Sequence, residues 1–142
     1  MPNNVIVDIC DDLVTYFGTL TLSQTFTARR VFLPVFDREN LSSFEVTVYP
    51  AAVSQSQATR ASSEFTFSIN VVVRKNINPA SDPDISASLY FTQELADKIT
   101  RYNSSVASWT ETENDPIFDL TTLVEKHEFL TVITASYKTI RS

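Results

Sequence analysis

The stretch EFTFSINVVVRKN, residues 64–76, constrains the fold more than any other part of the sequence. As far as Asn70, apolar and polar side chains alternate, which is the pattern of a β-strand covered on one face. Val72 breaks this alternation because it places an apolar side chain on the otherwise polar face. That face must therefore be covered as well, either by another part of the chain or by another molecule.

Other segments support a sheet. Residues 44–50 alternate cleanly and predict a strand, and residues 129–140 predict another. In this last strand Leu130 and Val132 put apolar side chains on the second face, as Val72 does in its own strand. Less regular extended structure is expected over residues 19–36 and around 106–112.

Helical periodicity predicts two long helices and one short one. The first spans residues 4–17 and carries an apolar stripe on one side. The second spans residues 83–102, with Asp82 as the expected N-cap and Pro83 at the first helical position. A short helix is expected just before His127.

Helices and strands in this order predict an α+β fold, a single domain over residues 1–142. We expect an antiparallel or mixed sheet of about four strands with helices packed on it. The segment AAVSQSQATRASS, residues 51–63, is small and polar without periodicity. It predicts a long mobile loop between two antiparallel strands.

The charge balance makes some partners poor candidates. Seventeen acidic residues against 11 basic ones give a net charge of −6, which argues against a phosphate-backbone binder. We therefore expect no direct sequence-specific binding to nucleic acid. No apolar run approaches the roughly 20 residues that span a bilayer, and no signal peptide is recognisable, so no membrane partner is expected either.

Few residues are suited to catalysis or to cofactor binding. Gly18 is the only glycine, which excludes the Gly-rich phosphate loops. His127 is the only histidine, and no nucleophile motif accompanies it, so a surface or helix-capping role is expected. Cys10 lies on the apolar stripe of the first helix and predicts a small core residue. We predict no catalytic residue, no cofactor and no metal site.

One acidic segment invites comparison with a calcium loop. Glu111, Glu113 and Asp115 occupy its positions 1, 3 and 5. Pro116 stands where the turn glycine is required, and Thr122 stands where the closing glutamate belongs. A solvated edge followed by a turn is the better interpretation, although a chance pair of carboxylates for acid–base chemistry stays open.

Two pairs of adjacent basic residues lie near strands of this acidic chain. They are either solvated strand ends or groups that meet acidic residues of a neighbouring copy. The sole tryptophan is either a core residue or an interface anchor. The two basic pairs, the tryptophan and the apolar residues on the second strand face form the candidate assembly interface. Its residues are Arg29, Arg30, Val72, Arg74, Lys75, Trp109, Leu130 and Val132.

Several stretches together resemble a known family. They are ARRVFLPVFDRENL, VTVYP, FSINVVVRKNINP, ENDPIFD and LVEKHEFLTVITASYK. In order and spacing they resemble the small tail-completion proteins of tailed bacteriophages, of the tail terminator type. The resemblance covers roughly residues 5–140, and its most specific part pairs RRVFLPVFD with the late ENDPIFD and the strand that ends in SYK.

The resemblance implies a structural virion protein without enzymatic activity. Such a subunit assembles as a ring, with six copies as the expected number, on the head-proximal end of the tail tube. The ring stops tube growth and joins the tail to the head connector. The implied partners are other copies of the chain, the tail tube protein, a connector or neck protein and, in a contractile tail, the sheath. The implied location is the virion tail or neck, and the host cytoplasm during assembly.

In such a ring, Val72, Leu130 and Val132 would face a neighbouring subunit or the tube, and the loop 51–63 would become ordered against a partner. Two other functions stay open. One is a head-completion or neck protein on the connector side. The other is a small acidic ligand-binding domain or enzyme, with a pocket under Trp109 and the nearby carboxylates.

Overall fold

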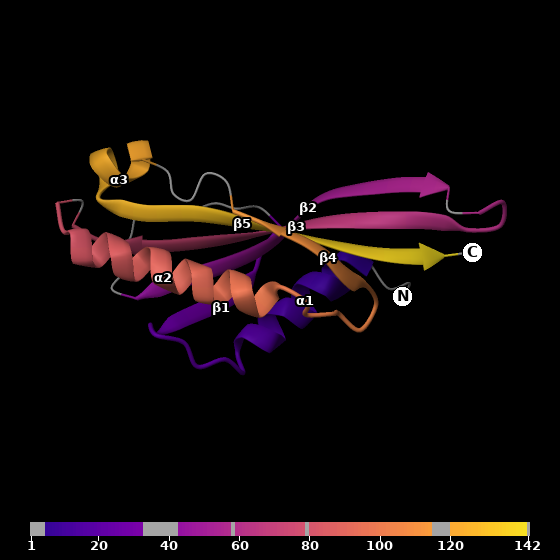
Figure 1. The fold of residues 1–142 in the computed structure, drawn as a ribbon, viewed down its shortest axis with the longest axis horizontal. Helices are drawn as coiled ribbons and strands as arrows, with labels where there is room; N and C mark the ends of the chain where they lie inside the picture. Colours follow the sequence, from indigo (N-terminus) through magenta and orange to yellow (C-terminus); the bar gives the residue numbers. More distant parts are fainter. Residues whose placement is uncertain (1–4, 33–42, 58, 79, 115–119, 142) are drawn as a thin grey trace.

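The computed structural model describes residues 5–32, 43–57, 59–78, 80–114 and 120–141 (Figure 1). The elements in chain order are α1 (Val5–Phe17), β1 (Phe26–Arg30), β2 (Phe44–Gln57), β3 (Ser63–Asn76), α2 (Asp82–Ile99), β4 (Ser108–Glu113), α3 (Leu120–Lys126) and β5 (Glu128–Arg141). The prediction of an α+β fold is confirmed.

The described strands form a single mixed sheet in the order β1-β2-β3-β5-β4. β1 runs parallel to β2, and the other neighbouring pairs are antiparallel. The sheet therefore has five strands and not about four. The two less regular segments of the sequence supply the edge strands: β1 is a short part of 19–36, of which 33–36 lie outside the described residues, and β4 matches the segment around 106–112.

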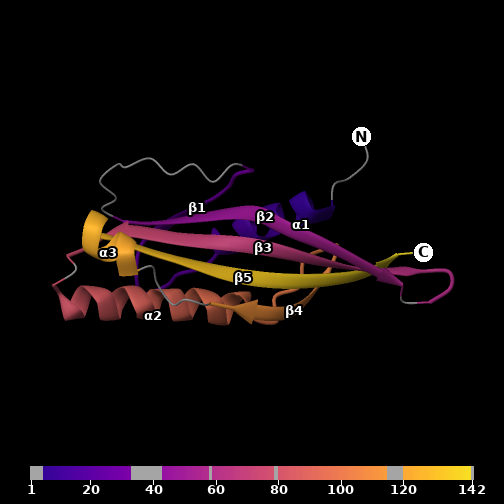
Figure 2. The ribbon, with the colours of Figure 1, turned by 90° about the horizontal axis from the view of Figure 1, so that it is seen from above.

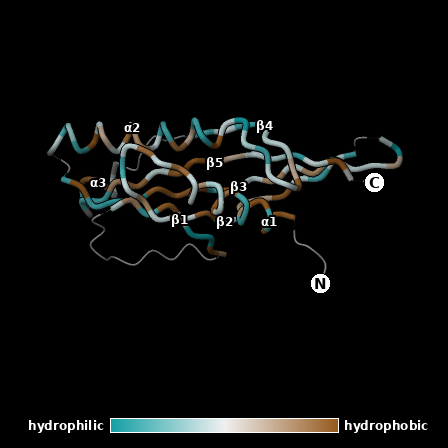
Figure 3. The backbone as a smooth tube through the Cα atoms, turned by 90° about the horizontal axis from the view of Figure 1, so that it is seen from below, coloured by the Kyte–Doolittle hydropathy of each residue, from teal (hydrophilic) through white to brown (hydrophobic). Residues whose placement is uncertain are grey.

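One hydrophobic core lies between the sheet and the two long helices. The predicted stripe of α1 is buried, with Ile9 and Leu13 both fully inaccessible. Phe91 of α2 stacks on Phe44 of β2, with ring centroids 4.3 Å apart. Figure 3 shows hydrophobic residues concentrated along the strands in the body of the molecule. We call the face of the sheet that α1 and α2 cover the core face.

The ends of α2 differ from the prediction. Ser81, and not Asp82, is the N-cap, because its side-chain oxygen accepts a hydrogen bond from the Asp84 backbone N–H at 3.3 Å. Pro83 consequently occupies the second helical position. The helix ends at Ile99, three residues earlier than predicted, and Arg101 adopts a left-handed conformation with φ 67°. That conformation turns the chain away from the helix axis.

The prediction of a long loop over 51–63 is wrong for most of its length. β2 continues to Gln57, which pairs with Ser63 at the start of β3, and a bulge lies between Pro50 and Ala52. Residues 51–57 show no periodicity because all of them are exposed and neither face is covered. Their extended conformation depends on backbone pairing with β3, which side-chain patterning does not report.

As a result, three strands extend beyond the helices at the end of the molecule where the C-terminus lies (Figures 1 and 2). We call the paired segments 51–57 of β2, 63–68 of β3 and 136–141 of β5 the arm. At its base Phe67 and Tyr137 are still buried in the core, and the part beyond them lies past the helices.

A single carboxylate ties α1 to the connection between α2 and β4. Asp12 accepts hydrogen bonds from the Ser104 hydroxyl at 2.7 Å and from the Ser105 N–H and hydroxyl at 2.9 and 2.8 Å. Nearby, Tyr16 stacks on Tyr102 with centroids 4.0 Å apart. Desolvation disfavours the charged carboxylate, but the serine hydrogen bonds outweigh it, and the pKa of Asp12 lies below its ordinary 3.8.

We predict that Phe91→Ala lowers the free energy of unfolding by about 3–5 kcal/mol, because it leaves a cavity under a fully buried aromatic pair. Urea denaturation followed by far-UV circular dichroism measures this change. Tyr90→Ala is the matched control on the same helix, since Tyr90 is 58% exposed, and its effect should stay within about 0.5 kcal/mol. Equal losses for the two variants would contradict this description of the core.

Asp12 should also make stability depend on acid pH. Its folded-state pKa is lower than its unfolded-state pKa, so its contribution is present above the unfolded value and is lost as pH falls through the folded value. Asp12→Ala should therefore lose less stability than the wild type between neutral and acid pH. Denaturation midpoints measured over that range test this. Parallel curves for the two proteins would refute it, and Ser104→Ala should give an intermediate slope.

Candidate functional site

The sheet face opposite the core face carries most of the candidate interface residues, and we call it the polar face. On this face Val72 of β3 lies directly opposite Val132 of β5, and Arg74 lies opposite Leu130. Arg29 of β1 is on the same face, because its neighbours in register are Thr47 and then Val72. The structure thus brings together five positions from three segments that are far apart in the sequence.

Val72 is covered by the chain itself. Its side chain is 2% exposed, although it does not belong to the main core cluster on the other face. Thr47, its neighbour on β2, is also fully buried. Val72 therefore needs no neighbouring subunit to cover it, and the expectation that it faces one is corrected. Leu130 and Val132 are half-buried.

Arg74 lies at the centre of an ionic row across the polar face. Its side chain is 3% exposed, and its Nε lies 2.6 Å from Glu128 Oε1 on β5. A second guanidinium nitrogen lies 3.6 Å from Glu45 Oε2 on β2. The other oxygen of Glu45 lies 2.5 Å from the Arg29 guanidinium on β1. Four strands are thereby joined by alternating charges.

The remaining basic candidates lie on the core face and also have partners within the chain. Arg30 Nε lies 2.6 Å from Asp11 Oδ1 of α1. The Lys75 ammonium lies 5.0 Å from the centre of the Phe44 ring. The hypothesis that the two basic pairs meet acidic groups of another copy is therefore not needed to explain them. α1, β2 and β5 supply carboxylates to the three arginines, and Lys75 lies over an aromatic ring.

A second polar row crosses the same face next to Val72, and sequence reasoning missed it. The Asn70 amide donates to the Tyr49 hydroxyl at 3.1 Å and accepts from the Thr134 hydroxyl at 3.0 Å. Asn70 is in register with both partners. Only the pairing of three strands brings these groups together, and no local sequence signal indicates it.

Trp109 packs as a half-buried residue at the edge of the core, which supports the core interpretation. Its indole N–H donates to the Thr112 hydroxyl at 2.7 Å, and its backbone N–H donates to Asn103 Oδ1 at 2.9 Å. A nearby hollow of about 470 Å³ is lined by Ser104–Ser108, Thr110 and Lys138–Ile140. Trp109 is not among these lining residues.

The predicted roles of Cys10 and His127 agree with the structure. Cys10 is fully buried, and this burial raises the pKa of its thiol to about 12, so it is a core residue and a poor nucleophile. His127 is exposed and has a left-handed backbone with φ 53°. Its N–H closes the end of α3 by donating to the Leu123 carbonyl at 3.1 Å.

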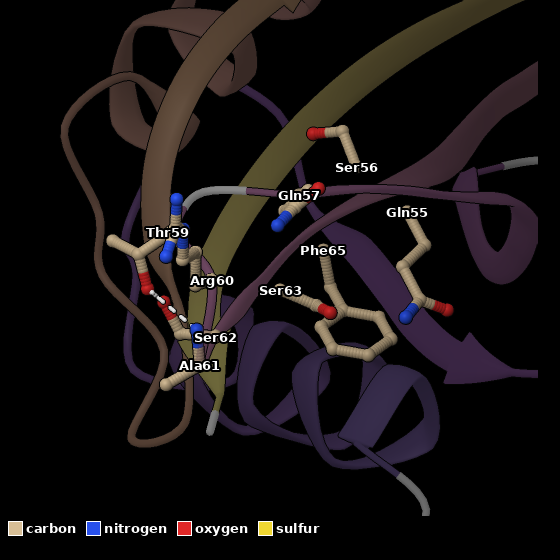
Figure 4. A pocket seen from close by; sticks show the side chains of 9 residues that line it. All are labelled: Gln55, Ser56, Gln57, Thr59, Arg60, Ala61, Ser62, Ser63 and Phe65. Carbon is tan, nitrogen blue, oxygen red and sulfur yellow. Dashed lines mark hydrogen bonds between the residues drawn. The ribbon is translucent and has the colours of Figure 1, made fainter.

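The tip of the arm forms an open hollow of about 790 Å³ (Figure 4). Its lining consists of hydroxyl, amide and small side chains with one aromatic ring and one cation: Gln55, Ser56, Gln57, Thr59, Arg60, Ala61, Ser62, Ser63 and Phe65. The Thr59 and Ser62 hydroxyls are hydrogen bonded at 2.7 Å and hold the turn. Among the described residues of this lining, none carries a carboxylate, imidazole or thiol that could act as a base or nucleophile.

Comparison with protein-family models and with curated protein sequences finds no match for this chain. The family resemblance accordingly rests on the sequence stretches quoted above. Within the described ranges, no three His, Cys, Asp or Glu side chains gather as metal ligands would. None of the described helices is long and apolar enough to cross a membrane.

Replacing Arg74 should be costly, because its loss leaves two part-buried carboxylates facing each other across β3. We predict that Arg74→Met lowers the free energy of unfolding by about 3–5 kcal/mol. Arg29→Met is the matched control: Arg29 also pairs with Glu45 but is 53% exposed, so about 0–1 kcal/mol is expected. Urea denaturation of both variants measures the difference, and a loss for Arg74→Met no larger than the control's would show that the row does not stabilise the sheet.

Proposed function

We propose that this protein is a non-enzymatic assembly subunit, a tail terminator that forms a ring on the head-proximal end of a phage tail tube. In this role it stops tube growth and joins the tail to the head connector. The expected ring contains six copies. Its other partners are the tube protein, the connector or neck protein and, in a contractile tail, the sheath.

The arm is the observation that carries this proposal. It extends beyond the helices, and its two faces each expose a large apolar side chain: Val53 is 54% exposed and Ile140 is 60% exposed. Apolar residues exposed on an extended sheet gain from burial against another protein. A free globular domain has no structural need for such an arm, whereas a subunit of a larger assembly can use it as a contact surface.

The polar face contributes in a different way. Because Arg74 and Val72 are buried within the chain, they stabilise the sheet from which the arm extends. We therefore assign the contact role to the arm and not to these two residues. Among the remaining candidates, the half-buried Leu130 and Val132 stay available for contact with another protein.

Deleting the gene in the phage that carries it tests the proposal. Negative-stain electron microscopy of the lysate should reveal filled heads beside separate tails of abnormal or overgrown length. Leaky heads beside tails of normal length would instead place the protein on the connector side. Joined particles of normal length would contradict a structural role, and a thermal-shift screen against small molecules would then test the ligand-binding alternative.

Complementation with arm variants links the function to the structure. Val53→Asp should fail to restore normal tails, because it puts a charge on a surface that must be desolvated in the assembly. Val124→Asp is the matched control, since Val124 on α3 is 59% exposed but lies away from the arm. Both purified variants should keep the wild-type unfolding midpoint. Restoration of normal tails by Val53→Asp would exclude this face of the arm as the contact surface.

A further inference from the structure

We propose that the outer edge of β2 in the arm pairs with the same edge of a second copy, so that the free protein forms a two-fold dimer. The inference goes beyond the proposed function. It concerns the protein in solution, and it involves a symmetric contact of a kind that a simple cyclic ring does not use.

Among the described residues, no strand pairs with the outer edge of β2 along the arm. β1 pairs with β2 only from Phe44 to Val48, and the last backbone bond between them runs from the Val31 N–H to the Val48 carbonyl at 2.9 Å. Beyond that point, none of the described strands lies on this side of β2. Residues 51–57 are all exposed, and Figure 1 shows β2 as the outer border of the arm.

The register decides which backbone groups point outward. Successive residues of a strand direct their N–H and C=O groups to opposite sides. The Phe44 N–H and the Val48 C=O form hydrogen bonds with the residues that flank β1. The odd-numbered residues of this part of β2, such as Thr47, therefore direct their backbone groups toward β3. Thr47 pairs with Val72, which sets the even-numbered residues of β3 toward β2.

The same alternation continues past the bulge of β2, because β3 keeps a regular register with β5 throughout. Ser68, Thr66 and Glu64 therefore face β2, where they pair with Ala52, Ser54 and Ser56. Val53, Gln55 and Gln57 are the residues of this segment whose backbone groups point away from β3. Each of them presents an N–H and a C=O at the open edge.

Beyond Pro50 and the bulge at its base, this edge lacks the usual protection against pairing. Natural edge strands are commonly blocked by charges or proline, and the opposite edge strand, β4, contains Glu111 and Glu113. Residues 51–57, AAVSQSQ, contain neither a charge nor a proline. In a protein with a net charge of −6, this uncharged edge is one along which two copies can meet without opposing like charges.

An antiparallel pairing centred on Gln55 satisfies all the outward groups. Gln55 then lies opposite Gln55 of the second copy, and Val53 lies opposite Gln57. Each of these pairs exchanges two backbone hydrogen bonds, as in any hydrogen-bonded antiparallel pair. The pairing uses the edge completely in both copies, so association stops at two and does not continue into a filament.

The shape of the molecule permits this contact. The arm extends away from the helices (Figures 1 and 2), and an antiparallel partner runs in the opposite direction along it. The body of the second copy then lies beyond the hairpin end of the first. The two acidic bodies are held apart by the length of the paired arms.

Sedimentation equilibrium over a concentration series tests the dimer. The wild type should follow a monomer–dimer equilibrium built on the 16.0 kDa chain. Gln55→Pro removes an outward N–H without touching the bonds to β3, since proline is tolerated at an edge. It should weaken dimerisation by at least about tenfold while the unfolding midpoint stays near the wild-type value.

Cross-linking gives an independent measurement. In the proposed register the two Gln55 Cα atoms lie about 5.5 Å apart, within the range for a disulfide. Gln55→Cys should therefore form a covalent dimer on mild oxidation. Ser54→Cys is the matched control. Ser54 lies opposite Ser56 of the second copy, so the two introduced thiols are not directly opposite each other and should not form a disulfide. The natural Cys10 is buried and does not interfere.

Three results would overturn the proposal. The first is a wild-type protein that stays monomeric over the whole series. The second is an oligomer, whether dimer or hexamer, that Gln55→Pro leaves unchanged. The third is equal cross-linking of Gln55→Cys and Ser54→Cys, which would indicate random collision. None of these results bears on the phenotype of the gene deletion, so the ring function is tested separately.

Discussion

The whole structure depends on the pairing of β3 with neighbours on both sides along its full length. β3 bonds to β2 from Ser63 to Arg74 and to β5 from Ser63 to Asn76. Its apolar side chains build the core with α1 and α2, and its backbone supports the outer part of the arm, which extends past the helices. Arg74 and Asn70 add polar links on the other face, each joining β2 to β5 across β3.

These polar links explain how a sheet with one helix-covered face keeps its register. A strand that slips by one residue exchanges its two faces. For β3, such a slip would place Arg74 in the apolar core and move Val71 and Val73 to the face that carries the polar links. The ionic row of Arg74 and the amide row of Asn70 therefore oppose a slip from one side of the sheet, while the core opposes it from the other.

The same residues account for the limits of reasoning from sequence. Basic residues next to apolar ones look like a surface for an acidic partner, but Arg29, Arg30 and Arg74 find their carboxylates at Glu45, Asp11 and Glu128. These partners lie on other elements, so the pairing depends on the fold and not on local spacing. The arm escaped prediction for a related reason. A strand with two exposed faces has no apolar alternation, and only its backbone partner identifies it.

The sequence by itself determined the α+β class, the buried stripe of α1, the core faces of β3 and β5 and the core position of Cys10. Each of these follows from the period at which apolar residues recur, and burial of apolar surface is the dominant favourable term in folding. Tertiary structure alone decided that the chain covers Val72, that Arg74 lies buried between two carboxylates, and that residues 51–57 continue β2 into an open edge. These features depend on which strands become neighbours and in which register, and that is set by contacts between residues far apart in the chain.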